Sequence, residues 1–159
     1  GIVLMKARDF SVLSEGQKEP LKKDIFFVDR KALEQSSSWI ISLDNGKNIT
    51  FHLKQRRDCE IVKSDCVKYF DYDKIKNSPC VRTRRQGDYL TVNSEGGRKK
   101  LNRIFIDEKI PAGLRDQIPV VAAGSEILWI PGGRMNEQYK ITSTTGRVLE
   151  LHYQGGALA

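Results

Sequence analysis

The residues of this sequence that could do chemistry are gathered in one basic segment. Between positions 82 and 115 the chain has nine basic and four acidic residues, a net charge of +5 out of +7 for the whole chain. The basic residues are Arg82, Arg84, Arg85, Arg98, Lys99, Lys100, Arg103, Lys109 and Arg115. Such a local excess is typical of a surface that binds a polyanion. A solvated surface without a ligand is the alternative, and charge alone favours that alternative.

The residue pattern gives no support to catalysis in this chain. A nucleophilic Ser or Cys needs a base within hydrogen-bonding distance. The two histidines, His52 and His152, are far apart in the sequence and lie on predicted strands. Asp107 and Glu108 are neighbours on a predicted helix, so they cannot converge on one substrate atom. We expect Asp107 to offset nearby Lys or Arg residues, and we expect no catalytic residue.

The three cysteines, Cys59, Cys66 and Cys80, fit neither a disulfide framework nor a metal site. An odd number of cysteines without close pairing argues against a secreted disulfide-rich domain. Their spacings of seven and fourteen residues match no zinc-binding pattern. We therefore expect no metal and a cytoplasmic location. No apolar run approaches the roughly 20 residues that a membrane span needs, so no membrane partner is expected.

Two glycines stand before the most basic part of the segment. Gly96 and Gly97 precede Arg98 at the start of a predicted helix. A helix N-terminus that follows glycines can bind a phosphate through its backbone N–H groups. The spacing lacks the pattern of nucleotide-binding loops. Two interpretations stay open: a site for one RNA phosphate, or a plain loop leading into a capped helix.

The elements that must position these residues are mostly predicted strands. Residues 1–70 are expected to form a β-rich upstream subdomain, in which strands at 39–43 and 49–53 flank an Asp-Asn-Gly turn typical of a hairpin. His52 falls on the polar face of the second of these strands. A C-terminal domain is expected over 71–153, followed by a frayed tail at 154–159.

In the C-terminal part, a strand over 80–85 would place Arg82 and Arg84 on one face. The principal helix is predicted at about 98–109, because Leu101, Ile104 and Phe105 form one apolar stripe. Further strands are predicted at 89–92, 120–122, 127–130, 138–142 and 147–153, and Trp129 is expected in the core. The predicted fold class is α+β, with mixed, mainly antiparallel sheets and one principal helix.

An ordered series of short motifs from about residue 81 to residue 153 resembles the C-terminal domain of bacterial tRNA(Ile)-lysidine synthase. The matching stretches are RTRRQGD at 82–88, GRKKL at 97–101, FIDEKIP at 105–111, RDQIP at 115–119, ILWIPGGR at 127–134 and RVLEL at 147–151. No single stretch is diagnostic, but their order and near-constant spacing are specific. Tyr89 and Asn102 depart from the family pattern, in which basic residues are common at both positions.

The resemblance implies both a fold and a role. The family's terminal domain is similar to a module of phenylalanyl-tRNA synthetase β subunits. The family enzyme uses ATP, with Mg, to activate the wobble cytidine of an isoleucine tRNA and then attaches lysine. That ligase chemistry belongs to an N-terminal ATP-pyrophosphatase domain, whose Ser-Gly-Gly-x-Asp-Ser loop this sequence does not contain. For this chain, the resemblance implies a non-catalytic region that binds the acceptor arm of tRNA.

On this interpretation the candidate RNA-binding residues contact phosphates. They are Arg82, Arg84, Arg85, Arg98, Lys99, Lys100 and Arg103, with Arg115 and Arg134 in second rank. The expected partners are tRNA, the enzyme's own N-terminal catalytic domain and, as a further option, a second copy in a homodimer. The alternative hypothesis is a structural or interaction module, whose basic face docks on the catalytic domain or on a dimer partner. An independent enzyme is the least favoured reading.

Overall fold

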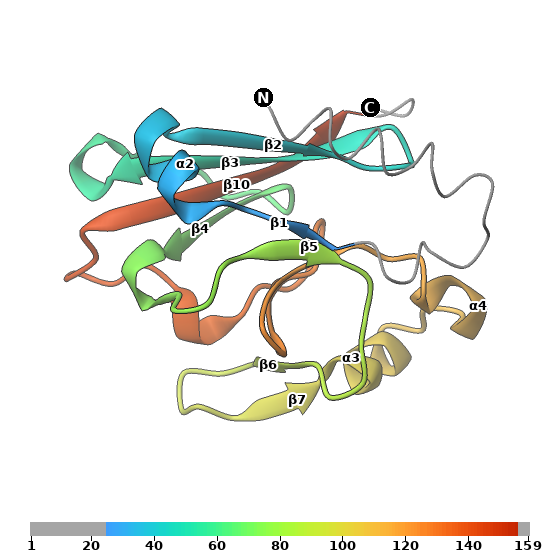
Figure 1. Cartoon of the computed structure of the whole chain (residues 1–159). Helices are drawn as coiled ribbons and strands as arrows, with labels where there is room; N and C mark the ends of the chain where they lie inside the picture. The colour runs from blue at the N-terminus through green and yellow to red at the C-terminus, as the bar shows by residue number, and fades with distance from the viewer. Residues whose placement is uncertain (1–24, 156–159) are drawn as a thin grey trace.

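Residues 25–155 of the chain are described by a computed structural model, and they form two β-sheets with short helices (Figure 1). The expected α+β class with mainly antiparallel sheets is confirmed. Two expectations, the β-rich character of residues 1–24 and the fraying of residues 156–159, lie outside the described residues.

The four-stranded sheet is built around a hairpin that the sequence predicted. Its strands are β2 (Ser38–Ser42), β3 (Lys47–Gln55), β4 (Val67–Asp71) and β10 (Arg147–Gly155). Their order is β2-β3-β10-β4, and every neighbouring pair is antiparallel. Gly46, in the turn between β2 and β3, has a φ of +84°, which glycine adopts without steric cost. The predicted hairpin is thus confirmed, and β10 extends the sheet beyond it.

The six-stranded sheet carries the basic segment at one edge. Its strands are β1 (Phe26–Phe27), β5 (Cys80–Arg82), β6 (Tyr89–Thr91), β7 (Arg98–Lys100), β8 (Val120–Ala123) and β9 (Glu126–Trp129). Their order is β1-β5-β8-β9-β6-β7, with β6 and β9 parallel and the other neighbours antiparallel. Within the described residues, β7 is therefore an edge strand of this sheet, with β6 as its neighbour.

Side chains that alternate along β8 show how the layers pack. Val121 faces a core shared with Phe51 of the four-stranded sheet and with Trp129, which is fully buried as predicted. Val120 points to the other side of the sheet, into a second core with Phe105 of helix α3 (Leu101–Asp107). The six-stranded sheet therefore lies between the four-stranded sheet and α3, and both of its faces are covered.

Helix α3 is shorter than the helix predicted at about 98–109. Residues Arg98–Lys100 form strand β7 instead, and the helix starts only at Leu101. The predicted apolar stripe is buried, as expected for a helix packed on a sheet. The chain turns away after the helix, where Lys109 has a positive φ of +59°.

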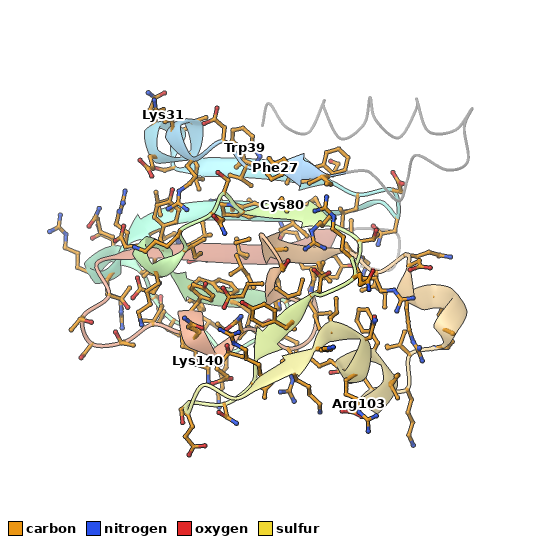
Figure 2. All side chains as sticks on the ribbon, turned by 60° about the horizontal axis from the view of Figure 1, so that its bottom comes forward. Phe27, Lys31, Trp39, Cys80, Arg103 and Lys140 are labelled. Carbon is orange, nitrogen blue, oxygen red and sulfur yellow. The ribbon has the colours of Figure 1, made fainter. Side chains whose placement is uncertain are left out.

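The remaining helical segments are short. Helix α4 is Ala112–Arg115, and helix α2 (Arg30–Ser36), which was not predicted, is capped by the Asp29 side chain. Between residues 25 and 155 there are three 3-10 helices, Arg56–Asp58, Tyr72–Lys74 and Glu137–Tyr139, so the strand predicted at 138–142 is wrong. The positions of Lys31 and Arg103 in Figure 2 show that α2 and α3 lie on opposite sides of the molecule. Between residues 25 and 155, no helix is long and apolar enough to cross a membrane.

Both sheets combine segments from the two sides of residue 70. Strand β1 pairs with β5, and β10 lies between β3 and β4. The boundary expected near residue 70 does not coincide with a break in packing. Strand β10 also includes Gln154 and Gly155, the first two residues of the expected frayed tail.

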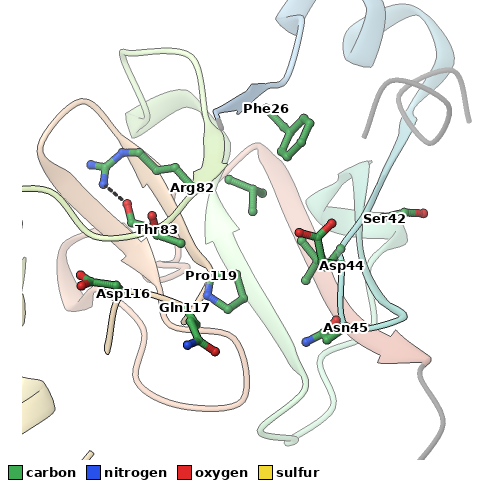
Figure 3. A pocket seen from close by; sticks show the side chains of 11 residues that line it. Phe26, Ser42, Asp44, Asn45, Arg82, Thr83, Asp116, Gln117 and Pro119 are labelled. Atoms are coloured by element: carbon green, nitrogen blue, oxygen red, sulfur yellow. Dashed lines mark hydrogen bonds between the residues drawn. The ribbon is translucent and has the colours of Figure 1, made fainter. Parts of the chain in front are cut away.

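Arg82 ends β5 and points into the protein, where it pairs with Asp88. The two side chains are 2% and 1% exposed, and the guanidinium donates two hydrogen bonds of 2.9 Å to the carboxylate. It also donates to the carbonyl oxygens of Thr83, at 3.0 Å (Figure 3), and of Gly124, at 2.9 Å. The strand predicted over 80–85 therefore ends already at Arg82, and Arg82 is a buried structural residue.

We expect the Asp88→Asn substitution to lower the free energy of unfolding by about 3–5 kcal/mol, because it leaves a buried guanidinium without a counter-charge. Urea unfolding followed by circular dichroism measures the change. Asp73→Asn is the matched control: it removes the exposed Arg147–Asp73 pair and should cost about 0–1 kcal/mol. Equal losses in the two variants would contradict a special role for the buried pair.

The cysteines give a second check of the packing. Cys59 and Cys80 are buried, and burial raises the pKa of both thiols, whereas Cys66 is exposed. Because the thiolate is the reactive form, we expect one fast-reacting thiol near neutral pH and three after denaturation. Cys66→Ser should remove the fast phase. A fast reaction of a second thiol in that variant would show that the described core is wrong.

Candidate nucleic-acid interface

Strand β7 and helix α3 carry four of the predicted RNA-binding residues, because the two elements follow each other directly. β7 pairs with β6, with Lys99 opposite the buried Leu90. Lys99 therefore points toward the α3 side of the sheet, and Arg98 and Lys100 point to the other side. Arg103 projects from the exposed side of α3 (Figure 2). The edge of the sheet thus presents cations on both of its faces.

The glycines before this cluster do not lead into a helix. Gly96, with a φ of +87°, lies in the turn between β6 and β7, and Gly97 donates its N–H to the Asn93 side chain at 2.9 Å. The cap residue of α3 is Lys100, and the first helical N–H, of Leu101, bonds to the carbonyl oxygen of Asp88 at 2.9 Å. Both interpretations of these glycines are therefore wrong, because the glycines lead into strand β7 and no helix begins directly after them.

Three of the cations, Lys99, Arg103 and Arg134, interact with the carboxylate of Asp107. It forms ion pairs with Lys99 and with Arg103, whose Nε lies 3.2 Å from Oδ1. The hydrogen bond from Lys99 lowers the pKa of Asp107, and the charges of Arg103 and Arg134 lower it further. This confirms that Asp107 offsets nearby cations. It also shows that the fold brings Arg134, from the segment after β9, to the same cluster, where positive charge exceeds negative charge.

Other predicted residues have no counter-charge within the described chain. Arg85, Arg98 and Lys100 are exposed and form no ion pair with any residue of the range 25–155. Long exposed cations of this kind can follow a phosphate backbone and release its counterions. They are the residues best suited to bind RNA directly.

Three predicted arginines make contacts that hold the fold together. Arg82 is buried against Asp88, so its guanidinium cannot reach a phosphate, and it does not share an exposed face with Arg84. Arg84 donates to Asp116 and to the Asn102 side chain, each at 2.8 Å. Arg115 donates from Nε to the carbonyl oxygen of Ile110 at 2.9 Å. Arg84 thus joins the loop after β5 to α3 and α4, which gives Asn102 a role that the sequence alone did not reveal.

The two histidines lie next to each other despite their distance in the sequence. Their rings are 5.3 Å apart on neighbouring strands, and His152 Nε2 lies 2.5 Å from Glu150 Oε2. Lys54 pairs with the same carboxylate at 3.0 Å. Within residues 25–155, no three His, Cys, Asp or Glu side chains are placed to hold a metal ion.

A cavity of about 480 Å³ opens between the β2–β3 turn and the segments that follow β5 and α4 (Figure 3). Two carboxylates, of Asp44 and Asp116, line it, and its other charged lining residue is Arg82, already neutralised by Asp88. A phosphate entering it would meet acidic side chains. The cavity is therefore a poor phosphate site, and the exposed edge at β7 is a better one.

Comparisons with known sequences identify relatives of this chain. The sequence model described as "TilS substrate C-terminal domain" matches residues 80–151. The tRNA(Ile)-lysidine synthase of Caldanaerobacter subterraneus subsp. tengcongensis is 47% identical over 91 residues, 57% of this chain and 20% of that protein. The one from Clostridium tetani is 35% identical over 135 residues, 81% of this chain and 29% of that protein. The chain therefore spans less than a third of the length of these curated relatives.

The solved structures add a likeness in three dimensions. The chain matches a protein described as "Crystal structure of TILS C-terminal domain" with a TM-score of 0.62 and 30% sequence identity. The match covers 74% of this chain and 90% of that one. The chain therefore belongs to the tRNA(Ile)-lysidine synthase family, and the region it contains is the C-terminal domain.

Proposed function

We propose that this chain is the non-catalytic C-terminal part of an ATP-dependent tRNA(Ile)-lysidine synthase and that it binds the acceptor arm of the tRNA. The observation that carries the proposal is the excess of cations over carboxylates at the β7 edge, in a chain of this family. Arg98 and Lys100 stand on one side of the edge strand, and Lys99 and Arg103 on the other.

Such an edge suits RNA because its cations lie on extended and helical elements that a phosphate backbone can follow. Contacts to phosphates hold a tRNA in position without reading its sequence. The shape of the A-form acceptor helix and its unpaired end would supply the selectivity. The binding is electrostatic, so its strength must fall as salt rises.

The chemistry of the parent enzyme belongs elsewhere in this proposal. ATP, with Mg, and lysine would bind the N-terminal catalytic domain, which would modify the wobble cytidine while the present domain holds the other end of the tRNA. That catalytic domain is the expected protein partner, and the cytoplasm is the expected compartment. The fold likeness to phenylalanyl-tRNA synthetase β subunits stays a prediction.

The double substitution Lys99→Ala/Lys100→Ala should weaken tRNA binding and flatten its salt dependence. Each lost phosphate contact lowers the slope of log K against log salt by about 0.7–0.9. Fluorescence anisotropy with labelled tRNA over a potassium chloride series measures both quantities, and circular dichroism checks the fold. Lys31→Ala/Lys74→Ala removes two exposed lysines on α2 and on the 3-10 helix after β4 and should change neither.

An unchanged salt slope in the Lys99/Lys100 variant would contradict the proposal. The competing interaction module makes a different prediction for the same protein. Size-exclusion chromatography with and without tRNA would then show a stable dimer that excludes tRNA, and the substitutions would weaken the dimer.

Asp107→Asn should act in the opposite direction. Its carboxylate now competes with RNA for Lys99, Arg103 and Arg134, so its loss should tighten tRNA binding and steepen the salt slope by about 0.7–0.9. The same anisotropy titration measures this. Glu137→Gln, which removes a carboxylate paired with Lys140, is the control and should leave the affinity unchanged. Weaker binding by the Asp107 variant would show that the carboxylate orients the cations instead of competing for them.

A further inference from the structure

The Tyr89–Arg98 pair gives the basic edge a flat surface as well as charge. The guanidinium carbon of Arg98 lies 4.7 Å from the centre of the Tyr89 ring. Arg98 is exposed, and Tyr89 is half-buried and belongs to neither hydrophobic core. The guanidinium therefore lies over one face of the ring, and the Arg98 side chain as a whole is open to solvent.

The register of the β6–β7 hairpin creates this pair. Tyr89 lies opposite Lys100, and Thr91 lies opposite Arg98, so all four side chains share one face of the sheet edge. Tyr89 and Arg98 are diagonal neighbours on that face, within reach of an aromatic and a long side chain. Gln138 is tied to the same face, because Thr91 donates to its side-chain oxygen at 3.4 Å.

Two other arginines stack on a tyrosine within residues 25–155, and both are already engaged. Arg30 and Arg147 lie over Tyr72 at 4.4 and 4.9 Å. Arg30 donates to the carbonyl oxygen of Ile75 at 2.6 Å, and Arg147 pairs with Asp73 at 2.6 Å. Those pairs are explained by the fold.

The guanidinium of Arg98 has no acceptor anywhere in the described chain. Its donors, and the plane that Tyr89 supports, are available to a ligand. A contact that only stabilised the hairpin would not need a guanidinium plane left open in this way, since an ammonium over the ring would serve.

We propose that Tyr89 and Arg98 form a stacking site for an unpaired nucleobase at the 3′ end of the acceptor arm. This proposal rests on the proposed function, and it specifies which part of the RNA binds at the β7 edge. Bases inside a helix already stack on one another, so a protein plane is best filled by an unpaired base at an end. Aromatic rings and guanidinium planes are the groups on which such bases stack.

The surroundings of the pair fit this ligand. Lys100, on the same face and without an ion pair in the described chain, can hold the phosphate next to the stacked base. The exposed amide of Gln138 lies on that face too and can meet the polar edge of the base. Lys99, Arg103 and Arg134, around Asp107 on the other face, would meet the phosphates of the helical part.

The test compares two RNAs: a hairpin with a blunt end, and the same hairpin with a short unpaired 3′ extension. The 159-residue chain should bind the extended RNA more tightly, by roughly five- to 150-fold, which is the range for one base–aromatic stack. Arg98→Lys keeps the charge but loses the plane. It should abolish this preference, which is measured as the ratio of the affinities of one variant for the two RNAs.

Two further variants guard against misfolding and non-specific effects. Tyr89→Leu should also reduce the preference, because it removes the ring that supports the guanidinium. Tyr153→Leu is the matched control: it removes the ring under Lys47, 5.2 Å away on the four-stranded sheet, and should keep the preference. Circular dichroism checks each fold.

The possible failures are distinguishable. Equal binding of the two RNAs by the unaltered chain, with salt-dependent affinity that the Lys99/Lys100 variant weakens, overturns the stacking site and leaves the proposed function standing. A preference that survives in both the Arg98 and Tyr89 variants overturns the stacking site as well. If neither RNA binds in a salt-dependent way, both the proposed function and the stacking site are wrong.

Discussion

The buried ion pair between Arg82 and Asp88 is the interaction on which the basic edge depends. Removing two charges from water is costly, and the pair is tolerated because both partners make further hydrogen bonds. The Asp88 carboxylate accepts two bonds from Arg82 and one from the backbone N–H of Arg85. The backbone carbonyl oxygen of Asp88 accepts a hydrogen bond from the N–H of Leu101, the first residue of α3. One residue therefore anchors the end of β5, the loop after it and the start of the helix that carries Arg103.

The basic segment contains two kinds of cationic residue that its sequence alone does not distinguish. Arg82 and Arg84 are matched with carboxylates, and they hold the loop and the helices in place. Arg98 and Lys100 are unmatched, and they stand on an edge strand. Charges at an edge also discourage another strand from pairing there, so the same side chains protect the sheet and remain available to an anionic partner.

Local patterns in the sequence predicted the parts of the fold that local forces determine. The Asp-Asn-Gly turn gave the hairpin of β2 and β3, and the apolar stripe of α3 was found because its spacing is helical. The helix was predicted too long because nothing in Arg-Lys-Lys shows that these residues pair with β6 across a glycine turn. The strand predicted at 138–142 failed for a similar reason, since an alternating pattern does not provide a partner strand.

The candidate site was predicted in outline, as a basic segment, and missed in its details. The burial of Arg82 depends on Asp88 folding back across six residues, and the proximity of Arg134 to Asp107 depends on the whole sheet order. Tyr89 appeared in the sequence only as a departure from a basic pattern. Its contact with Arg98 becomes visible once the register of β6 and β7 is known.

The central position of β10 has a consequence for the way the chain is made. β10 pairs with β3 over nine residues on one side and with β4 on the other, yet β3 and β10 lie about a hundred residues apart in the sequence. The ribosome therefore releases β2, β3 and β4 long before the strand that joins them. Until residues 147–155 emerge, the inner edges of β3 and β4 have no permanent neighbour, and pairing across so long a loop is intrinsically slow. During synthesis, these edges of the newly made chain are exposed to aggregation, and a chain that ended before residue 147 would leave them permanently unpaired.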